Sequence, residues 1–259
     1  MSFEFNKRIK DIGERVFLAK IAGLIDDDIL GFDDDASAFL LPSGEILVLN
    51  VDMLVKKTDV LPSMSHAQIG NKAVTMSVSD IVAKGVKPLG CLVSVGFPSN
   101  MDVQEAMAIL EGVKEQCTKY NVSFLGGDLN ESCDVIIDVV TFGLSKKESL
   151  VSRKGAKNGD LVYSTGLFGW TSLGFKIQLE DLSVSPSLAE NSNKSVNQPE
   201  AKISYLPLFN SSPIIACIDS SDGLFVSLST LSTLNNLGIK VNHVPILILK
   251  WLHLQKKEV

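Results

Sequence analysis

The chain has 259 residues, of which 45% are hydrophobic and 21% charged, and its formal net charge is −6. This composition can fill one large core or two modest ones and argues against a disordered chain. The acidic balance argues against nucleic acid as the main partner. The four cysteines form no CxxC pair, the N-terminus lacks a signal-peptide pattern and no apolar run reaches membrane-spanning length. We therefore expect a soluble cytoplasmic protein with reduced thiols and no membrane partner.

Apolar periodicity along the N-terminal half predicts helices alternating with strands. Helices are expected over about 3–22, 67–84 and 99–120, and strands over 45–52, 89–98, 122–128 and 134–145. Beyond about residue 146 we expect glycine-punctuated loops around a short strand, a polar surface loop over 181–200, and a strand, turn and helix over 212–231. Two α/β domains, residues 1–147 and 148–259, fit this pattern.

Aspartates recur at the ends of the predicted strands and helices. One acidic turn is usually a solvated loop or a helix cap, but Asp80 lies inside an apolar helix pattern. A lone buried carboxylate there would cost several kcal/mol. Lysines are poor candidates for pairing with so many carboxylates, whereas Mg²⁺ suits such a cluster and commonly shares its ligand shell with phosphate. The sequence therefore predicts a nucleotide phosphate site, built from Asp34, Asp35, Asp52, Asp80, Asp128, Asp219 and Asp222.

The usual nucleotide motifs are absent, since the sequence holds neither GxxxxGK[ST] nor two glycines in GxG spacing. Gly126-Gly127-Asp128 is either an ordinary turn or a backbone that faces a charged ligand. Ser221 and Asp222 precede a predicted helix, whose first N–H groups favour anions. Arg153 is either a phosphate clamp or a solvated loop residue. The residues alone leave these alternatives open.

Six motifs between Asp33 and Leu224 resemble those of thiamine-monophosphate kinases, in the same order and with similar spacing. They are DDDASAF, NVDMLVKKTDV, KAVTMSVSDIVAKGVKP, LGGD, SRKGAKNGD and IDSSDGL, and VKKTDV is more similar to archaeal members. That family belongs to the aminoimidazole-ribonucleotide synthetase-like superfamily. The resemblance implies a two-domain α/β (α+β) fold. It also implies a homodimer, in which the N-terminal sheets, within residues 1–147, join into a barrel and the ATP site lies near the interface.

The resemblance also implies ATP-dependent phosphorylation of thiamine monophosphate to thiamine diphosphate, by direct in-line transfer assisted by several Mg²⁺ ions. It implies no single catalytic base. Residues matching ATP-binding positions are Gly127, Asp128, Arg153 and Ser221, and Asp59 falls at a substrate-binding position. Residues matching metal ligands are Asp35, Asn50, Asp52, Asp80, Asp128, Asp219 and Asp222. We expect Asp35, Asp52, Asp80, Asp128 and Asp219 to converge at one cleft.

The chain departs from the family pattern at several positions. Asp33 stands where the family has glycine, which leaves the register of the acidic run open by one residue. Asn50 and Val51 stand where family members often have two threonines. The chain also lacks the family's final segment, so we expect an incomplete C-terminal α/β domain, loose packing of residues 241–259 and weak substrate binding.

Two other functions stay open at this point. One is a sister ATP-dependent synthetase of the same superfamily. The other is a nucleotide-binding protein without turnover. Product analysis separates the first from a kinase, and turnover separates the second.

Overall fold

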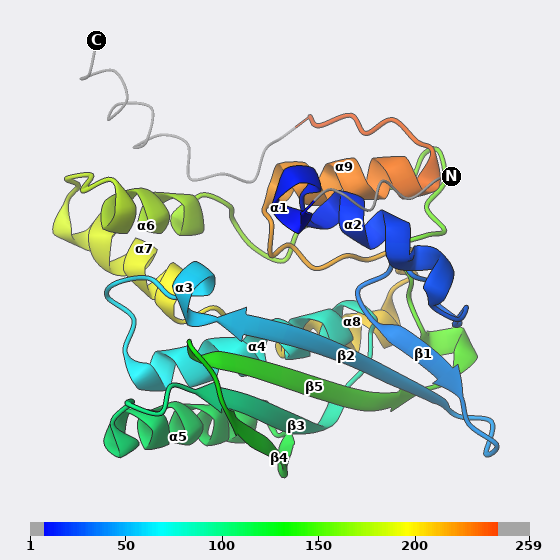
Figure 1. The fold of residues 1–259 in the computed structure, drawn as a ribbon. Helices are drawn as coiled ribbons and strands as arrows, with labels where there is room; N and C mark the ends of the chain where they lie inside the picture. The colour runs from blue at the N-terminus through cyan, green and yellow to red at the C-terminus, as the bar shows by residue number, and fades with distance from the viewer. Residues whose placement is uncertain (1–7, 243–259) are drawn as a thin grey trace.

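The structure is a computed structural model that describes residues 8–242 (Figure 1). Its N-terminal part holds one five-stranded sheet in the order β1-β2-β5-β3-β4. β3 and β4 are parallel, and the other neighbouring pairs are antiparallel. The strands are β1 Ser37–Leu40, β2 Ile46–Val55, β3 Pro88–Phe97, β4 Ser123–Glu131 and β5 Ile136–Ser145. The apolar runs predicted all of them except the short β1.

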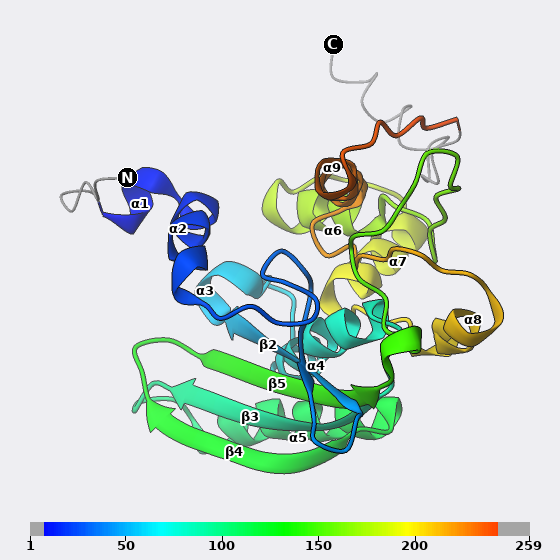
Figure 2. The ribbon, with the colours of Figure 1, turned by 90° about the vertical axis from the view of Figure 1, so that its right-hand side faces the viewer.

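Two long helices, α4 His66–Ala83 and α5 Val103–Tyr120, cover one face of this sheet (Figures 1 and 2). Both lie where the periodicity predicts them. The Ser65 and Asp102 side chains cap their first turns by accepting a hydrogen bond from a backbone N–H. Buried residues of both helices, such as Val78 and Val113, form one core with buried residues of β3 and β5.

α4 and α5 approach each other closely at two glycines. A Cβ atom on Gly112 would lie 2.1 Å from the carbonyl oxygen of Ala67, and one on Gly70 would lie 2.0 Å from that of Ile109. Both distances are far below van der Waals contact. The helix pair therefore depends on glycine at these positions.

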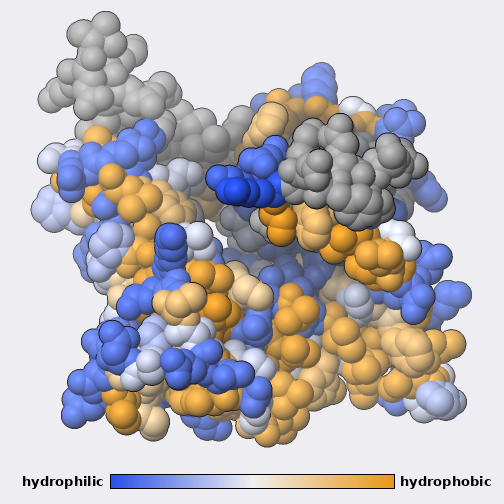
Figure 3. Space-filling view, viewed as in Figure 1, coloured by the Kyte–Doolittle hydropathy of each residue, from blue (hydrophilic) through white to orange (hydrophobic). Residues whose placement is uncertain are grey.

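The other face of the sheet is open and apolar. Phe39, Val51, Met53 and Leu125 are 56–65% exposed there, and Leu92 is also exposed. Figure 3 shows apolar side chains gathered over the strands in the lower part of the view. A sheet with two apolar faces needs a cover on each side, and within residues 8–242 long helices lie on only one.

The regular elements after residue 145 in the described part of the chain are helices, separated by irregular segments. The helices are α6 Trp170–Leu179, α7 Pro186–Asn197, α8 Leu206–Ser211 and α9 Leu224–Asn235, with single 3-10 turns at Lys147–Ser149 and Ile203–Tyr205. The expected strands near 160–165 and 212–219 are wrong, because both segments run without strand pairing. An extended segment becomes a strand only when a neighbouring strand takes its backbone hydrogen bonds. The expected α/β layer is therefore helical and irregular among the described residues.

The predicted polar loop over 181–200 is also wrong, since it contains α7. Ser185 and Pro186 stand at the start of this helix, where proline is tolerated at the first turn. Val196 and Ser192 are buried on its inner side, and α7 packs against α6. The many Ser and Asn residues favour a loop in sequence analysis, and the helix has only a narrow buried stripe to indicate otherwise.

At the N-terminus the single expected helix is broken. Gly13, with φ +77°, separates α1 Ile9–Ile12 from α2 Glu14–Ile21, and a 3-10 turn follows at Ala22–Leu24. Figure 2 shows α1 and α2 standing apart from α9. The short α3 Lys56–Asp59 follows β2 directly. No helix among residues 8–242 is long and apolar enough to cross a membrane. The expectation for 241–259 falls almost wholly outside these residues.

Candidate functional site

Three carboxylates from distant parts of the chain meet beside the sheet. Each of Asp35, Asp80 and Asp219 offers an oxygen, and these atoms all lie within 4.8 Å of one another. Asp35 belongs to the loop before β1, Asp80 to α4, and Asp219 to the extended segment before α9. Asp52, on the helix-covered face of β2, forms a side-chain hydrogen bond with Asp80. The sequence predicted these four residues to converge, and within one chain they do.

Burial and mutual repulsion raise the pKa values of the carboxyl groups of Asp52, Asp80 and Asp219. Burial, followed by the charges of Asp219, Asp52 and Asp35, raises the pKa of Asp80 to about 9. Burial, followed by the charge of Asp35, raises the pKa of Asp219 to about 6. Burial also raises the pKa of Asp52. The cluster is therefore poorly compensated where Asp80 lies, and it favours a bound cation or proton.

Two basic side chains reach the Asp35 side of the cluster. The ammonium of Lys84 lies 2.5 Å from Asp34 Oδ1 and 2.7 Å from Asp35 Oδ2. The Arg153 guanidinium contacts Asp35 Oδ1, and its Nη2 lies 3.9 Å from Asp219 Oδ1. Asp34 therefore pairs inside the fold, and the expectation that lysine is a poor partner is wrong here. Lys84 directly follows α4 and comes four residues after Asp80, a spacing that would favour a pair with Asp80, but its partners are Asp34 and Asp35.

The loop of Arg153 is held by the C-terminal helix α9. The Asn235 side chain accepts hydrogen bonds from the N–H groups of Gly155 and Ala156 and donates one to the carbonyl of Arg153. The Arg153 N–H in turn donates to Asp34 at 2.9 Å. Arg153 is thus a fixed member of the cluster and is largely shielded from solvent.

Asn50 faces the same cluster from β2. Its amide nitrogen donates to Asp80 Oδ2 at 2.7 Å and to the backbone oxygen of Asp35 at 2.8 Å. Its Oδ1 is buried and has no hydrogen-bond partner among the described residues. An unpaired amide oxygen beside three carboxylates is the donor set that Mg²⁺ prefers. The residues present therefore fit a divalent cation.

Asp128 does not join this cluster within one chain, so the expected five-residue convergence is wrong in that respect. Asp128 pairs with Ser94, which pairs with Asp138, and Asp138 pairs with Met53. These residues share the open face of the sheet, whereas Asp52 lies on the helix-covered face. Three strand spacings also separate β4 from β2, a distance of about 14 Å. Spacing along the chain does not fix the register between strands, so it does not tell whether Asp52 and Asp128 share a face.

Gly127 has a structural role of its own. Its φ is +157°, and a Cβ atom would lie 1.7 Å from the backbone oxygen of Val93. Glycine is therefore required where β4 runs against β3, at the point where their register shifts.

The remaining expected site residues lie on or near the surface. The Asp59 carboxylate accepts a hydrogen bond from the N–H of Val55 at 2.7 Å and so closes the turn of α3. The Ser221 N–H donates to Asp219 at 3.2 Å. Ser221 and Asp222 are both exposed in the turn before α9.

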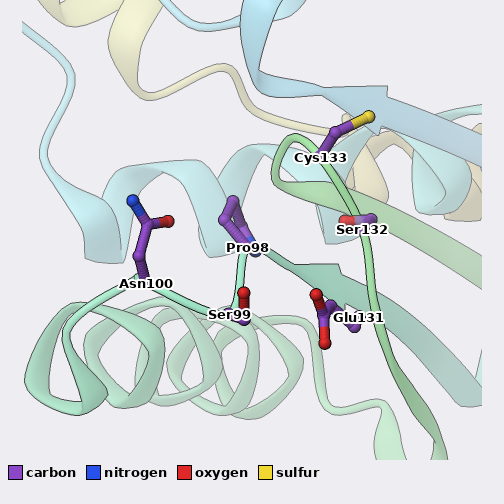
Figure 4. A pocket seen from close by; sticks show the side chains of 6 residues that line it. All are labelled: Pro98, Ser99, Asn100, Glu131, Ser132 and Cys133. Atoms are coloured by element: carbon purple, nitrogen blue, oxygen red, sulfur yellow. The ribbon is translucent and has the colours of Figure 1, made fainter.

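Two open cavities lie elsewhere on the described part of the chain. The first, of about 430 Å³, is lined by Pro98, Ser99, Asn100, Glu131, Ser132 and Cys133 (Figure 4). The second, of about 490 Å³, adjoins α3 and the start of α4 and includes Lys56, Lys57 and His66. Neither is lined by Asp35, Asp80 or Asp219.

Comparison with known proteins identifies relatives of this fold. Residues 33–145 match the family model "AIR synthase related protein, N-terminal domain". The thiamine-monophosphate kinase of Nitrosopumilus maritimus is 30% identical over 212 residues, which cover 82% of this chain and 67% of that protein. That of Pyrococcus horikoshii is 33% identical over 217 residues, covering 84% and 67%. The chain thus spans about two thirds of these relatives.

Solved structures agree with these matches. The structure of AaThiL complexed with AMPPCP and TMP has a TM-score of 0.81 and 26% identity, and the match covers 90% of this chain and 74% of that one. The HypE–HypF complex, at 20% identity and a TM-score of 0.65, shares the fold alone. With identities of 30–33% to curated relatives over more than four fifths of its length, the chain belongs to the thiamine-monophosphate kinase family and is a kinase.

Proposed function

We propose that this protein transfers the γ-phosphoryl group of ATP to the phosphate of thiamine monophosphate, giving thiamine diphosphate and ADP. The convergence of Asp35, Asp80 and Asp219 within 4.8 Å carries the proposal. Both reactants are anionic, and a carboxylate cluster that holds divalent cations removes their repulsion. AaThiL, whose solved complex contains AMPPCP and TMP, supports the choice of both substrates.

The reaction is a direct in-line transfer. The bond from the γ-phosphorus to the β–γ bridging oxygen breaks, and a phosphate oxygen of thiamine monophosphate forms the new bond to phosphorus. Such a transfer needs positioning and charge neutralisation more than a general base. Several Mg²⁺ ions supply the neutralising charge when bound. In this proposal they are held by Asp35, Asn50, Asp52, Asp80, Asp219 and Asp222.

Arg153 is the positively charged side chain that contacts the phosphate groups in this proposal. Its guanidinium lies between Asp35 and Asp219, where it would contact a phosphate bound at the cluster. Ser221 offers a hydroxyl and an N–H in the turn before α9. Asp59, the proposed substrate contact, is the last residue of α3, next to Val60, which lines the cavity that includes Lys56 and Lys57.

The functional unit in this proposal is a homodimer. Its N-terminal halves, residues 1–147, pair through the open faces of their sheets into a barrel. The exposed side chains of Phe39, Val51 and Met53 support this arrangement. Asp128 lies on the same open face, so in the dimer it would face the second copy. Its proposed contacts to ATP and metal therefore require the partner, as do those of Gly127. In this proposal residues 148–259 make up the second domain.

A product assay tests the activity. The purified protein is incubated with ATP, Mg²⁺ and thiamine monophosphate, and the products are measured by liquid chromatography and mass spectrometry. We expect thiamine diphosphate and ADP in equal amounts, and no product with unphosphorylated thiamine. ADP formed without thiamine diphosphate would favour a sister synthetase. Nucleotide binding without either product would indicate a nucleotide-binding protein without turnover.

A further inference from the structure

Lys84 is a fully buried charged residue in the core of the described chain. Its ammonium group has three partners: Asp34 Oδ1 at 2.5 Å, Asp35 Oδ2 at 2.7 Å and the backbone oxygen of Cys217 at 3.1 Å. An ammonium has three protons to donate. Two hydrogen bonds, to Asp34 and to Cys217, and one ion pair, with Asp35, therefore join Lys84 to segments that carry or flank the acidic cluster.

The contact with Asp35 fixes how this carboxylate is turned. Its Oδ2 is held by Lys84, while its Oδ1 points to Arg153, whose Nη2 lies 3.9 Å from Asp219. Lys84 and Arg153 thus hold the Asp35 carboxylate from its two oxygens, beside Asp80 and Asp219. Without Lys84 the carboxylate would lose its anchor and could rotate.

The contact with Cys217 fixes a second ligand. Cys217 precedes Asp219 by two residues in a segment without strand pairing. The segment is held from one side by the bond from the Cys217 N–H to the carbonyl of Ser152, at 3.0 Å, and from the other by Lys84. One side chain, at the C-cap of α4, therefore contacts the segments of both Asp35 and Asp219 and sets their placement relative to Asp80.

We infer that Lys84 is a positioning residue of the phosphoryl-transfer site, one that holds Asp35 and Asp219 ready for divalent cations without itself touching substrate. This inference rests on the proposed function. Positioning and simple charge repulsion predict opposite effects of removing Lys84 on metal affinity. A nearby ammonium repels a metal ion, so its removal would tighten metal binding if charge alone mattered. Loss of positioning weakens metal binding instead.

The test is Mn²⁺ binding by the full chain without nucleotide, followed by electron paramagnetic resonance as a probe of the Mg²⁺ sites. We expect Lys84→Met to weaken Mn²⁺ binding about 10- to 100-fold, the usual cost of losing a residue that orients a metal ligand. Lys87→Met, the same change three positions along at an exposed lysine, should leave the affinity within about twofold of the wild type. Unchanged or tighter binding by Lys84→Met would overturn the inference.

Lys84→Met leaves the buried carboxylates of Asp34 and Asp35 without their positively charged partner, which could unfold the protein. A second variant therefore separates positioning from folding. Lys84→Met combined with Asp34→Asn restores the charge balance, and its thermal unfolding is measured alongside. Weak Mn²⁺ binding in a folded double variant supports positioning. Full recovery of binding would trace the loss in Lys84→Met to the unpaired buried carboxylates and would overturn the inference, and loss of folding in both variants would assign Lys84 to stability alone. Wild-type protein that binds Mn²⁺ but makes no thiamine diphosphate would contradict the proposed function and leave the positioning result standing.

Discussion

Asp80 lies on the inner side of α4 with Asp52, Asp35 and Asp219 around it, and its pKa rises to about 9. Asn50 is the group that donates a hydrogen bond to it from β2. Lys84 and Arg153 compensate Asp34 and Asp35, whereas Asp80, with its raised pKa, keeps a proton at neutral pH unless a cation replaces it. At the scale of single residues, this is the place where a cation gains most.

Asp52→Asn tests this assignment. The change keeps the size of the side chain and removes one negative charge, so the fold should persist while metal binding and turnover fall. We expect kcat to drop by about 100-fold or more, at the upper end of what the loss of a residue supporting a metal site costs. Steady-state kinetics at varied Mg²⁺ measure it, with the exposed Asp27→Asn as matched control. An Asp52→Asn protein with the wild-type rate and Mg²⁺ dependence would remove Asp52 from the site.

Sequence reasoning at this scale found the carboxylates and missed their partners. Asp80 stood out because a charge inside an apolar helix pattern needs an explanation. Lys84 stood out less, since a lysine near a helix end usually reaches solvent. Only the fold brings Asp34 to Lys84, 50 positions along the chain.

At the scale of elements, strands with continuous apolar runs were predictable, as were helices with a broad apolar stripe. α7 was hidden by its polar composition, although Ser185 and Pro186 mark its start. The segment over 212–219 has the composition of a strand, but its backbone pairs with Ser152 at a single point instead of along a neighbouring strand. Whether an extended segment becomes a strand depends on partners elsewhere in the fold.

The contact of α4 with α5 predicts that a glycine-to-alanine change inside a helix lowers stability here, although such changes usually raise it. Replacing glycine by alanine inside a helix normally stabilises by about 0.5–1 kcal/mol. At Gly112 the new methyl group would collide with the backbone of Ala67, so we expect Gly112→Ala to lower the free energy of unfolding by about 1–3 kcal/mol. Urea unfolding followed by circular dichroism measures the change.

Gly23→Ala is the control for this experiment, because a Cβ atom there meets nothing within 4 Å. It should leave stability unchanged or slightly raised. A Gly112→Ala protein as stable as the wild type would mean that α4 and α5 can separate at little cost.

At the scale of the whole molecule, the sheet is covered by long helices on one face and is apolar on both. Exposed apolar surface of this extent marks an interaction site. We expect light scattering at micromolar concentration to give twice the 28.0 kDa of the chain. A wild-type monomer under these conditions would rule out the dimer.

The open face can be tested by a single charge. Val51→Asp places a carboxylate in the middle of it and should shift the protein to monomer while each chain stays folded. Val103→Asp makes the same change at an exposed residue at the start of α5, and should leave the dimer intact. A dimer that tolerates Val51→Asp as well as Val103→Asp would place the interface elsewhere.

The measurement that bears most directly on this account is the rate of thiamine diphosphate formation as a function of free Mg²⁺, in the wild type and in Asp80→Asn. The account predicts no product without divalent cation and a steep rise with Mg²⁺ in the wild type. It predicts a strongly reduced rate in Asp80→Asn at every Mg²⁺ concentration. Thiamine diphosphate formed at the same rate after removal of divalent cations, or by both proteins alike, would contradict it.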